Sequence, residues 1–167
     1  MCRIKEIGEQ LKIQRFRAPL VVIAGPAIMM AIAAMSAQAA PTNVGTGFNA
    51  SNYNTSTQKK EGTLTATGTL CKKAYTKQGF KVQGVMKVTK IAGVFKSTQR
   101  FNARVWVNDG TTVTGPNKAV SVGATSTTAL TPGYVSGSDS VQLSIGGSGL
   151  LAGETSSLVK VSSLGNC

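Results

Sequence analysis

The chain contains no histidine among its 167 residues. Histidine is the usual general base near neutral pH, the usual partner of serine and cysteine nucleophiles, and the commonest protein ligand of metal ions. Its absence removes the most frequent kinds of hydrolytic and transition-metal site. We therefore expect the protein not to be an enzyme and to bind neither a cofactor nor a metal ion.

Acidic residues are also scarce, with 6 Asp or Glu against 18 Lys or Arg. A glycosidase needs two carboxyl groups held about 5 to 10 Å apart in a cleft, and calcium needs several clustered oxygen ligands. The acidic residues beyond residue 39 stand singly beside Gly, Ser or Thr, which indicates solvated turns. They are Glu61, Asp109, Asp139 and Glu154.

Aromatic residues make up only 5% of the chain, and no stretch after residue 40 sustains a helical period of 3.6. Short runs that alternate with period 2, separated by Gly, Pro, Asn and Asp, are typical of all-β domains. We therefore predict an antiparallel β-sandwich, immunoglobulin-like in outline, with six to seven short strands over residues 62–167. A small barrel is the alternative fold.

One long apolar run stands apart from this pattern. Residues 18–40 carry no charge, a basic region precedes them, and Ala37-Gln38-Ala39 has the small-x-small form that signal peptidases cut behind. We interpret residues 1–39 as a signal peptide, so that the protein is exported to the periplasm, the cell surface or the exterior. The alternative is an uncleaved anchor, because about 20 apolar residues cross a bilayer. Gly25-Pro26 interrupts the run and favours cleavage.

Residues 40–61 are rich in Asn, Thr, Ser and Gly and contain few large apolar side chains. Such a segment buries too little surface to offset the entropy lost on ordering. We expect a flexible polar leader between the signal peptide and the β-domain.

The stretch 81–109 shows the clearest strand pattern and contains the only Trp. It has two alternating runs, each with an apolar and a polar face, and we interpret it as a β-hairpin with a buried apolar side and a basic outer side. Its register is open, with a turn either at Ala92-Gly93 or over residues 92–98. The buried faces are predicted to carry Val82, Met86 and Val88 in the first run and Phe101, Ala103, Val105 and Val107 in the second.

Alternation predicts further strands on both sides of this stretch. Before it, Leu64, Ala66 and Leu70 alternate with threonines from Gly62 onward. After it, the Asp109-Gly110 dipeptide predicts a turn. The strands expected beyond that turn lie at residues 112–114, around Val120 and Val122, at Val141 to Ile145, and at 157–164 with Val159 and Val161 inward.

Two cysteines remain after removal of residues 1–39, which take Cys2 with them. Two cysteines in an exported chain predict one disulfide, between Cys71 and Cys167. Such a bond requires Cα atoms about 5 to 6 Å apart. It would hold the segment at Cys167 beside the strand that ends at Cys71.

The same 128 residues hold 13 Lys or Arg and four Asp or Glu, a net charge of +9. An excess of this size favours contact with anionic polymers or surfaces, although outward lysines also keep β-proteins soluble. In the first case the outer side of the hairpin is the expected binding surface, with tryptophan available to stack on a base or sugar ring. The candidate residues are Lys81, Lys87, Lys96, Arg100, Arg104 and Trp106.

Two functions follow from these features. The first is a non-catalytic structural or adhesive component of the cell envelope, cell surface or extracellular matrix, with self-association or other surface proteins as partners. The second is a polyanion-binding module for nucleic acid, anionic glycan or lipid head groups. In either case the chain would contact a membrane only through its signal segment.

Overall fold

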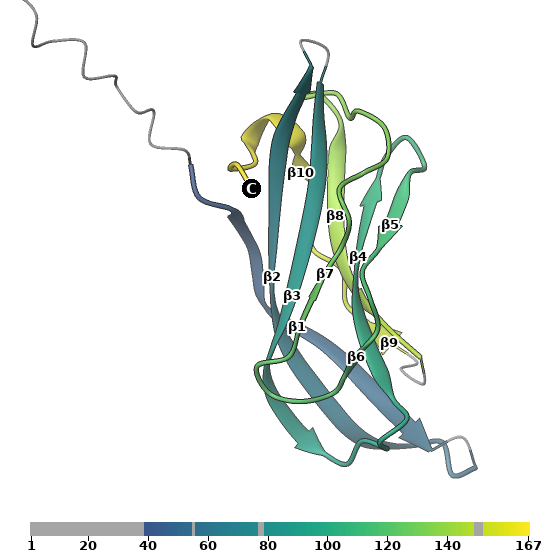
Figure 1. The fold of residues 1–167 in the computed structure, drawn as a ribbon. Coiled ribbons are helices and arrows are strands. Elements are labelled where there is room, and N and C mark those ends of the chain that lie inside the picture. The colour runs from purple at the N-terminus through teal and green to yellow at the C-terminus, as the bar shows by residue number, and fades with distance from the viewer. Residues whose placement is uncertain (1–38, 55, 77–78, 149–151) are drawn as a thin grey trace, which may run out of the picture. The chain divides into compact units, whose positions relative to one another are not determined.

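The computed structural model describes residues 39–54, 56–76, 79–148 and 152–167 (Figure 1). The predicted signal peptide, and the anchor that was its alternative, therefore lie outside the described residues except for their last one or two positions. Within the described part of the chain, no helix is long and apolar enough to cross a membrane.

The described residues form an all-β structure with two antiparallel sheets. The first sheet has the order β7–β3–β2–β1–β9. The second has the order β10–β8–β4–β5, and β6 pairs with β4. The bounds in the first sheet are β1 (Thr42–Asn54), β2 (Lys59–Thr76), β3 (Gly79–Gly93), β7 (Thr125–Thr127) and β9 (Ala152–Gly153). Those in the second are β4 (Arg100–Val107), β5 (Thr112–Thr114), β6 (Lys118–Ala119), β8 (Ser140–Gly146) and β10 (Val159–Lys160), followed by one turn of 3₁₀ helix at Val161–Ser163.

Both sheets contribute side chains to one hydrophobic core. The alternating patterns predicted for the buried faces are confirmed, because every second residue is buried from Gly62 to Leu70 in β2, from Val82 to Val88 in β3, and along β4 and β8. Gly84 lies at a close approach of the two sheets, since a Cβ there would meet Val105 at 2.5 Å and Leu143 at 2.6 Å. A glycine inside a strand often marks such an approach. The predicted core residues Val82, Met86, Val88, Phe101, Ala103, Val105 and Val107 are all at most 1% exposed.

The flexible leader predicted over residues 40–61 is wrong. Residues Thr42–Asn54 form β1, which pairs with β2 along most of its length. Phe48 and Ala50 point into the core and are 4% and 1% exposed. The register shifts between Asn43 and Phe48 break the alternation that marks a strand in sequence. The compact domain therefore includes β1 and does not begin at residue 62.

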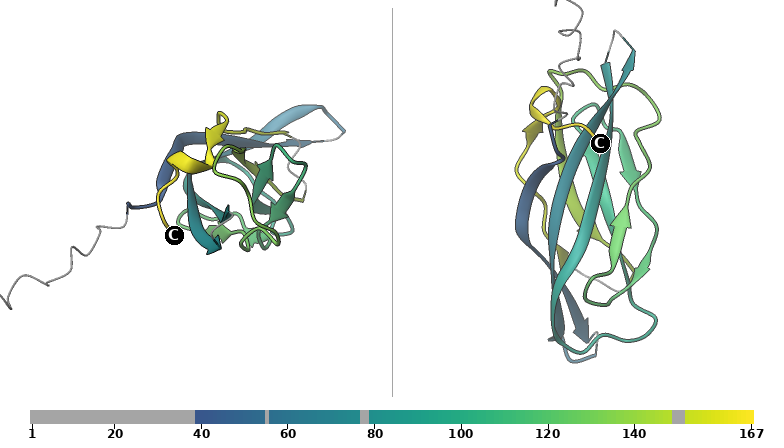
Figure 2. Two further views of the ribbon diagram at one scale, coloured as in Figure 1. Left: turned by 90° about the horizontal axis from the view of Figure 1, so that it is seen from above. Right: turned by 60° about the vertical axis from the view of Figure 1, so that its left-hand side comes forward.

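The hairpin predicted over residues 81–109 is also wrong. β3 pairs with β2 and β7 in the first sheet, whereas β4 pairs with β8, β5 and β6 in the second. The connection from Val94 to Gln99 thus crosses from one sheet to the other. The hairpin is instead formed by β2 and β3, which run side by side in both views of Figure 2.

The number and length of the strands differ from the prediction. The described residues contain ten strands rather than six or seven, and β1, β2 and β3 have 13, 18 and 15 residues. The strand expected around Val120 and Val122 is reduced to Lys118–Ala119, and Val122 is 64% exposed. The predicted turn at Asp109 is present, and its carboxylate accepts a hydrogen bond from the amide of Thr111.

Candidate functional site

The six residues predicted as a polyanion site do not share one surface. Lys81 and Lys87 alternate with buried residues of β3 and face outward from the first sheet. Arg104 and Trp106 alternate with buried residues of β4 and face outward from the second. The core lies between these two pairs.

The two remaining candidates lie at the crossing between the sheets. Lys96 is exposed in the connection from β3 to β4. The guanidinium of Arg100 donates hydrogen bonds to the backbone carbonyls of Ser97 and Gln99, so it holds the connection in place. Lys96 and Arg100 therefore do not join the lysines of the first sheet to Arg104 and Trp106 of the second. The single basic surface predicted for the hairpin does not form.

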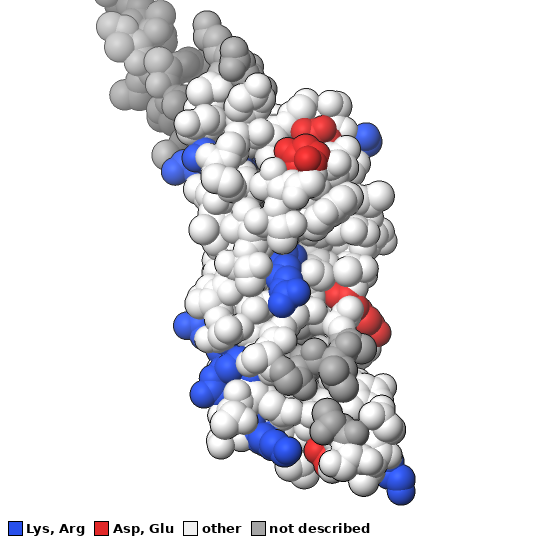
Figure 3. Space-filling view, turned by 90° about the vertical axis from the view of Figure 1, so that its right-hand side faces the viewer, with Lys and Arg blue, Asp and Glu red and all other residues white. Residues whose placement is uncertain are grey.

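Acidic and basic side chains occur together on the side of the molecule where β5 lies in Figure 1. Figure 3 views that side and shows red and blue atoms distributed over the same surface. Arg104 on β4 donates a hydrogen bond to the side-chain oxygen of Asn102, at 3.2 Å. Trp106, on the same strand, is 40% exposed. This side therefore carries charges of both signs rather than one (Figure 3).

The outer face of the first sheet has a different composition. Its side chains are those that alternate with the buried residues of β2, β3 and β7, and most are lysine or threonine. Threonine favours strands, because its branched side chain packs well on a pleated surface. We call this surface the lysine–threonine face. It comprises Lys73, Lys81, Lys87 and Lys90 together with Thr63, Thr65, Thr67, Thr69, Thr125 and Thr127.

The strand register sets the positions of the four lysines. Lys73 lies directly opposite Lys81, Lys87 lies opposite Thr67, and Lys90 lies opposite Thr65. Lys81 and Lys87 are six residues apart on one strand, which is about 20 Å at about 3.3 Å per residue. The face therefore carries a basic pair at one end and two further lysines near the other, with hydroxyl groups between them.

The charge of this face is not neutralised within the described chain. None of the four lysines makes an ion pair with a described residue. The ammonium of Lys81 lies 4.3 Å from the ring centroid of Tyr75, which leaves its charge in place. Glu61, on β2 itself, accepts hydrogen bonds from the side chains of Asn52 and Asn54. A second acidic residue, Glu154, lies beyond β1. Its carboxylate accepts hydrogen bonds from the amide and side chain of Asn49.

A shallow polar hollow of about 420 Å³ adjoins the face at this margin. Its lining combines hydroxyl, amide, ammonium and carboxylate groups from β1, β2 and the segment at β9. The lining residues are Asn49, Ser51, Lys60, Thr63, Gly153 and Glu154.

Of the four lysines on this face, only Lys81 and Lys87 were among the candidates predicted from the sequence. Lys73 and Lys90 were missed because the outer sides of β2 and β3 were not recognised as one surface. The alternating threonines of residues 63–69 were a usable signal, because they mark the outer side of β2. The pairing of β2 with β3 was the missing information.

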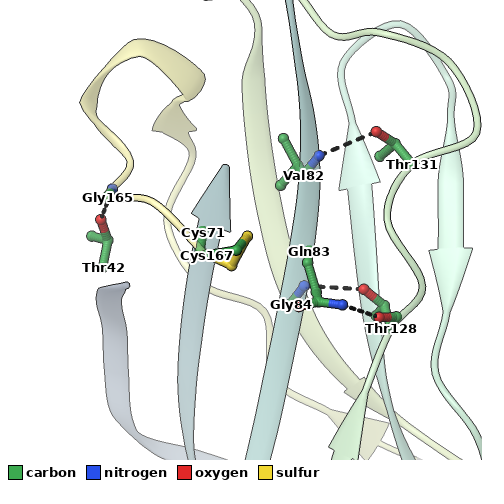
Figure 4. The surroundings of a disulfide bond; sticks show 9 residues. All are labelled: Thr42, Cys71, Val82, Gln83, Gly84, Thr128, Thr131, Gly165 and Cys167. Atoms are coloured by element: carbon green, nitrogen blue, oxygen red, sulfur yellow. Dashed lines mark hydrogen bonds between the residues drawn. A yellow bond between two sulfur atoms is a disulfide. The ribbon is translucent and has the colours of Figure 1, made fainter. Parts of the chain in front are cut away.

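Buried hydroxyl groups accept hydrogen bonds from strand amides where β7 and the irregular segment after it, 128–135, run along β3. The amide of Gly84 donates to the hydroxyl of Thr128 at 3.0 Å, and that of Val82 donates to Thr131 at 3.2 Å (Figure 4). In the second sheet, Ser126 and Ser156 accept from the amides of Ala103 and Leu143 in the same way. All four hydroxyl residues are at most 7% exposed. These contacts satisfy buried donors, and those at β3 occupy part of an otherwise open sheet edge.

The predicted disulfide is confirmed, with a Cα–Cα distance of 4.9 Å between Cys71 and Cys167 (Figure 4). The segment 165–167 runs parallel to β2, since Lys72 donates its amide to Gly165 and accepts from the amide of Cys167. On its other side, Gly165 donates to the hydroxyl of Thr42 and Asn166 donates to the carbonyl of Ala39. We call residues 165–167 with their disulfide the C-terminal clamp, because they join the start of β1 to β2.

Among the described residues, no three His, Cys, Asp or Glu side chains gather as metal ligands. No protein-family model, curated protein or solved structure matches this chain.

Proposed function

We propose that the protein is an exported, non-catalytic β-domain, immunoglobulin-like in outline, that serves as a structural or adhesive component of the cell envelope, cell surface or extracellular matrix. The observation that carries this proposal is the C-terminal clamp. A disulfide of this kind persists in oxidising compartments and is rare in the cytosol. The uncharged segment 18–40 with its basic flank supplies the matching export signal.

The clamp also suits a structural role. It holds Ala39, Thr42, Lys72 and Cys167 together through four backbone or side-chain hydrogen bonds besides the disulfide. The start of the domain, one long strand and the end of the described chain are thereby fixed to one another. An envelope or matrix protein benefits from such cross-linking, because it works outside the reach of intracellular chaperones.

Adhesion through a sheet face fits the molecule better than adhesion through the β3 edge. The hydroxyls of Thr128 and Thr131 and the carbonyls of the same segment occupy the hydrogen-bonding groups of β3. A partner strand would have to displace this segment first. The broad outer face of the first sheet is open by comparison.

The test is fractionation of cells that express the full chain. We expect retention in the envelope or surface fraction, a mature mass that corresponds to cleavage behind Ala39, and no free thiol at Cys71 or Cys167 under non-reducing conditions. Cytoplasmic protein with two free thiols would contradict export. An exported protein recovered entirely as a free soluble monomer would contradict the structural or adhesive role.

Polyanion binding remains the second candidate, but on a different surface from the one predicted by sequence. The candidates Arg104 and Trp106 lie across the core from Lys81 and Lys87. The observation that favours this function is the unneutralised lysine–threonine face.

A further inference from the structure

We propose that the lysine–threonine face of the first sheet binds an anionic polysaccharide, whose carboxylate or sulfate groups contact Lys73, Lys81, Lys87 and Lys90. This inference rests on the adhesive function proposed above and names its partner. Lys59, Lys60 and Lys72 also lie on β2, at its start and beside the C-terminal clamp, whereas Lys96, Arg100, Arg104, Lys118 and Lys160 lie at the sheet crossing or on the second sheet.

Charge complementarity is the first argument. Lys73, Lys87 and Lys90 are exposed, Lys81 is half-buried, and none is paired with a described acidic residue. Four like charges on one face destabilise each other slightly and attract a polymer that carries regularly spaced negative charges. The separation of about 20 Å between Lys81 and Lys87 calls for an extended ligand rather than a small anion.

The groups between the lysines point to a sugar polymer. Thr67 and Thr69 on β2 and Thr125 and Thr127 on β7 place hydroxyl groups on the same face. The hydroxyls of Thr67 and Thr125 donate to the backbone carbonyls of Lys87 and Gly123, and their oxygens can still accept from a ligand. Hydroxyls both donate and accept hydrogen bonds, as do the hydroxyls of a sugar ring. The carboxamide of Gln83 is held beside them, because its nitrogen donates to the carbonyl of Thr128 at 2.9 Å.

Nucleic acid fits this face less well. Proteins that bind single strands combine a basic groove with aromatic rings on which successive bases stack. The only tryptophan, Trp106, lies on the other sheet. Tyr75 stands at one end of the face and is already in contact with the ammonium of Lys81.

A bilayer also fits less well. Surfaces that bind membranes combine basic residues with apolar side chains that enter the head-group boundary. The large apolar side chain on the central strands of this face is Val85, which is half-buried between Thr69 and Thr127. The face therefore lacks the apolar anchor that lipid association uses.

The experiment measures binding of the purified exported protein to immobilised heparin and to polygalacturonate, which supply sulfate and carboxylate respectively. Neutral dextran, single-stranded DNA and vesicles with anionic lipid are the comparison ligands. We expect at least one of the two polysaccharides to bind, with affinity that falls steeply with salt concentration. Dextran should not bind. Which of the two binds more tightly identifies the anionic group.

Matched variants assign the binding to the face. The test variant replaces Lys73, Lys81, Lys87 and Lys90 with glutamine. The control variant makes the same change at Lys96, Arg104, Lys118 and Lys160, which lie elsewhere and remove the same charge. We expect the test variant to weaken binding at least about tenfold and the control less than about threefold, because only the first removes the contacts.

A third variant guards against misfolding. Replacement of the same four lysines with arginine keeps the charge and should retain binding within about threefold if charge is what the polymer contacts. Equal losses in the test and control variants would overturn the proposal, as would failure of both polysaccharides to bind the original protein. Tighter binding of DNA or vesicles than of either polysaccharide would also overturn it. Because binding is measured on purified protein, its failure is independent of the fractionation result.

Discussion

The hydroxyl of Thr128 accepts a hydrogen bond from the amide of Gly84 at 3.0 Å, next to the end of β7 where β3 loses its regular strand partner. At this position a buried side-chain hydroxyl accepts the hydrogen bond that a backbone carbonyl of a neighbouring strand accepts elsewhere in the sheet. The same substitution of hydroxyl for carbonyl recurs at Thr131.

Replacing Thr128 with valine keeps the shape of the side chain and removes the acceptor. A buried donor left without a partner costs about 1 to 3 kcal/mol, so we expect the free energy of unfolding to fall by about that amount. Thr127→Val is the matched control, because Thr127 is exposed and should change stability by less than about 0.5 kcal/mol. Urea denaturation of both variants measures the difference. Equal effects would show that the hydroxyl contact contributes nothing.

The Cys71–Cys167 bond closes a loop with a sequence separation of 96. The chain-entropy model gives up to about 4 to 5 kcal/mol for a loop of this size. Cys71→Ser and Cys167→Ser should therefore lose similar stability, and the double variant should lose little more than either one. Thermal unfolding with and without reductant provides the comparison. Losses that add in the double variant would mean that each cysteine stabilises independently of the bond.

Phe48 tests whether β1 belongs to the domain. Its side chain is 4% exposed within the core, and Phe→Ala in a core costs about 3 to 5 kcal/mol. Thr46→Ala, at an exposed position of the same strand, should be close to neutral. The free energies of unfolding of the two variants, measured with denaturant, show whether β1 is part of the folded domain. A Phe48→Ala protein as stable as the original would restore the interpretation of a flexible leader.

Trp106 reports on where a polyanion binds. It is the only tryptophan and lies on the second sheet, with the core between it and the lysine–threonine face. Saturation with a bound polysaccharide should therefore leave its fluorescence intensity and emission maximum unchanged. Quenching that follows the binding curve would instead place the ligand on the sequence-predicted residues around Arg104.

Periodicity made the faces of the strands predictable, but not their partners. The pattern of Val82, Met86 and Val88 is the same whether β3 pairs with β4 or with β2. The residues between the two runs, 94–99, are compatible with a hairpin turn and equally with a crossing. Whether residues 94–99 form a turn or a crossing depends on how the apolar faces of the two sheets pack against each other. That packing involves strands far from these residues in the sequence.

Other features had weak signals or none. β1 buries Phe48 and Ala50 amid polar residues, and its bulges disturb the alternation that would reveal it. Thr128 and Thr131 lie in a Ser/Thr-rich stretch, and nothing in the sequence shows which of its hydroxyl groups accept hydrogen bonds from backbone amides. The disulfide was predictable because two cysteines remain once residues 1–39 are interpreted as a signal peptide, and two cysteines allow a single intramolecular pairing.

The two sheets differ in how far apart along the chain their partners lie. β1, β2 and β3 follow one another and pair with their neighbours, whereas β4 reaches across to β8, so that Arg104 pairs with Ser144. Loop closure is less costly for the first arrangement. We expect the β1–β2–β3 meander to nucleate folding and the β4–β8 ladder to form later. Core substitutions in β2 and β3 should then mainly slow folding, while those in β8 should mainly accelerate unfolding.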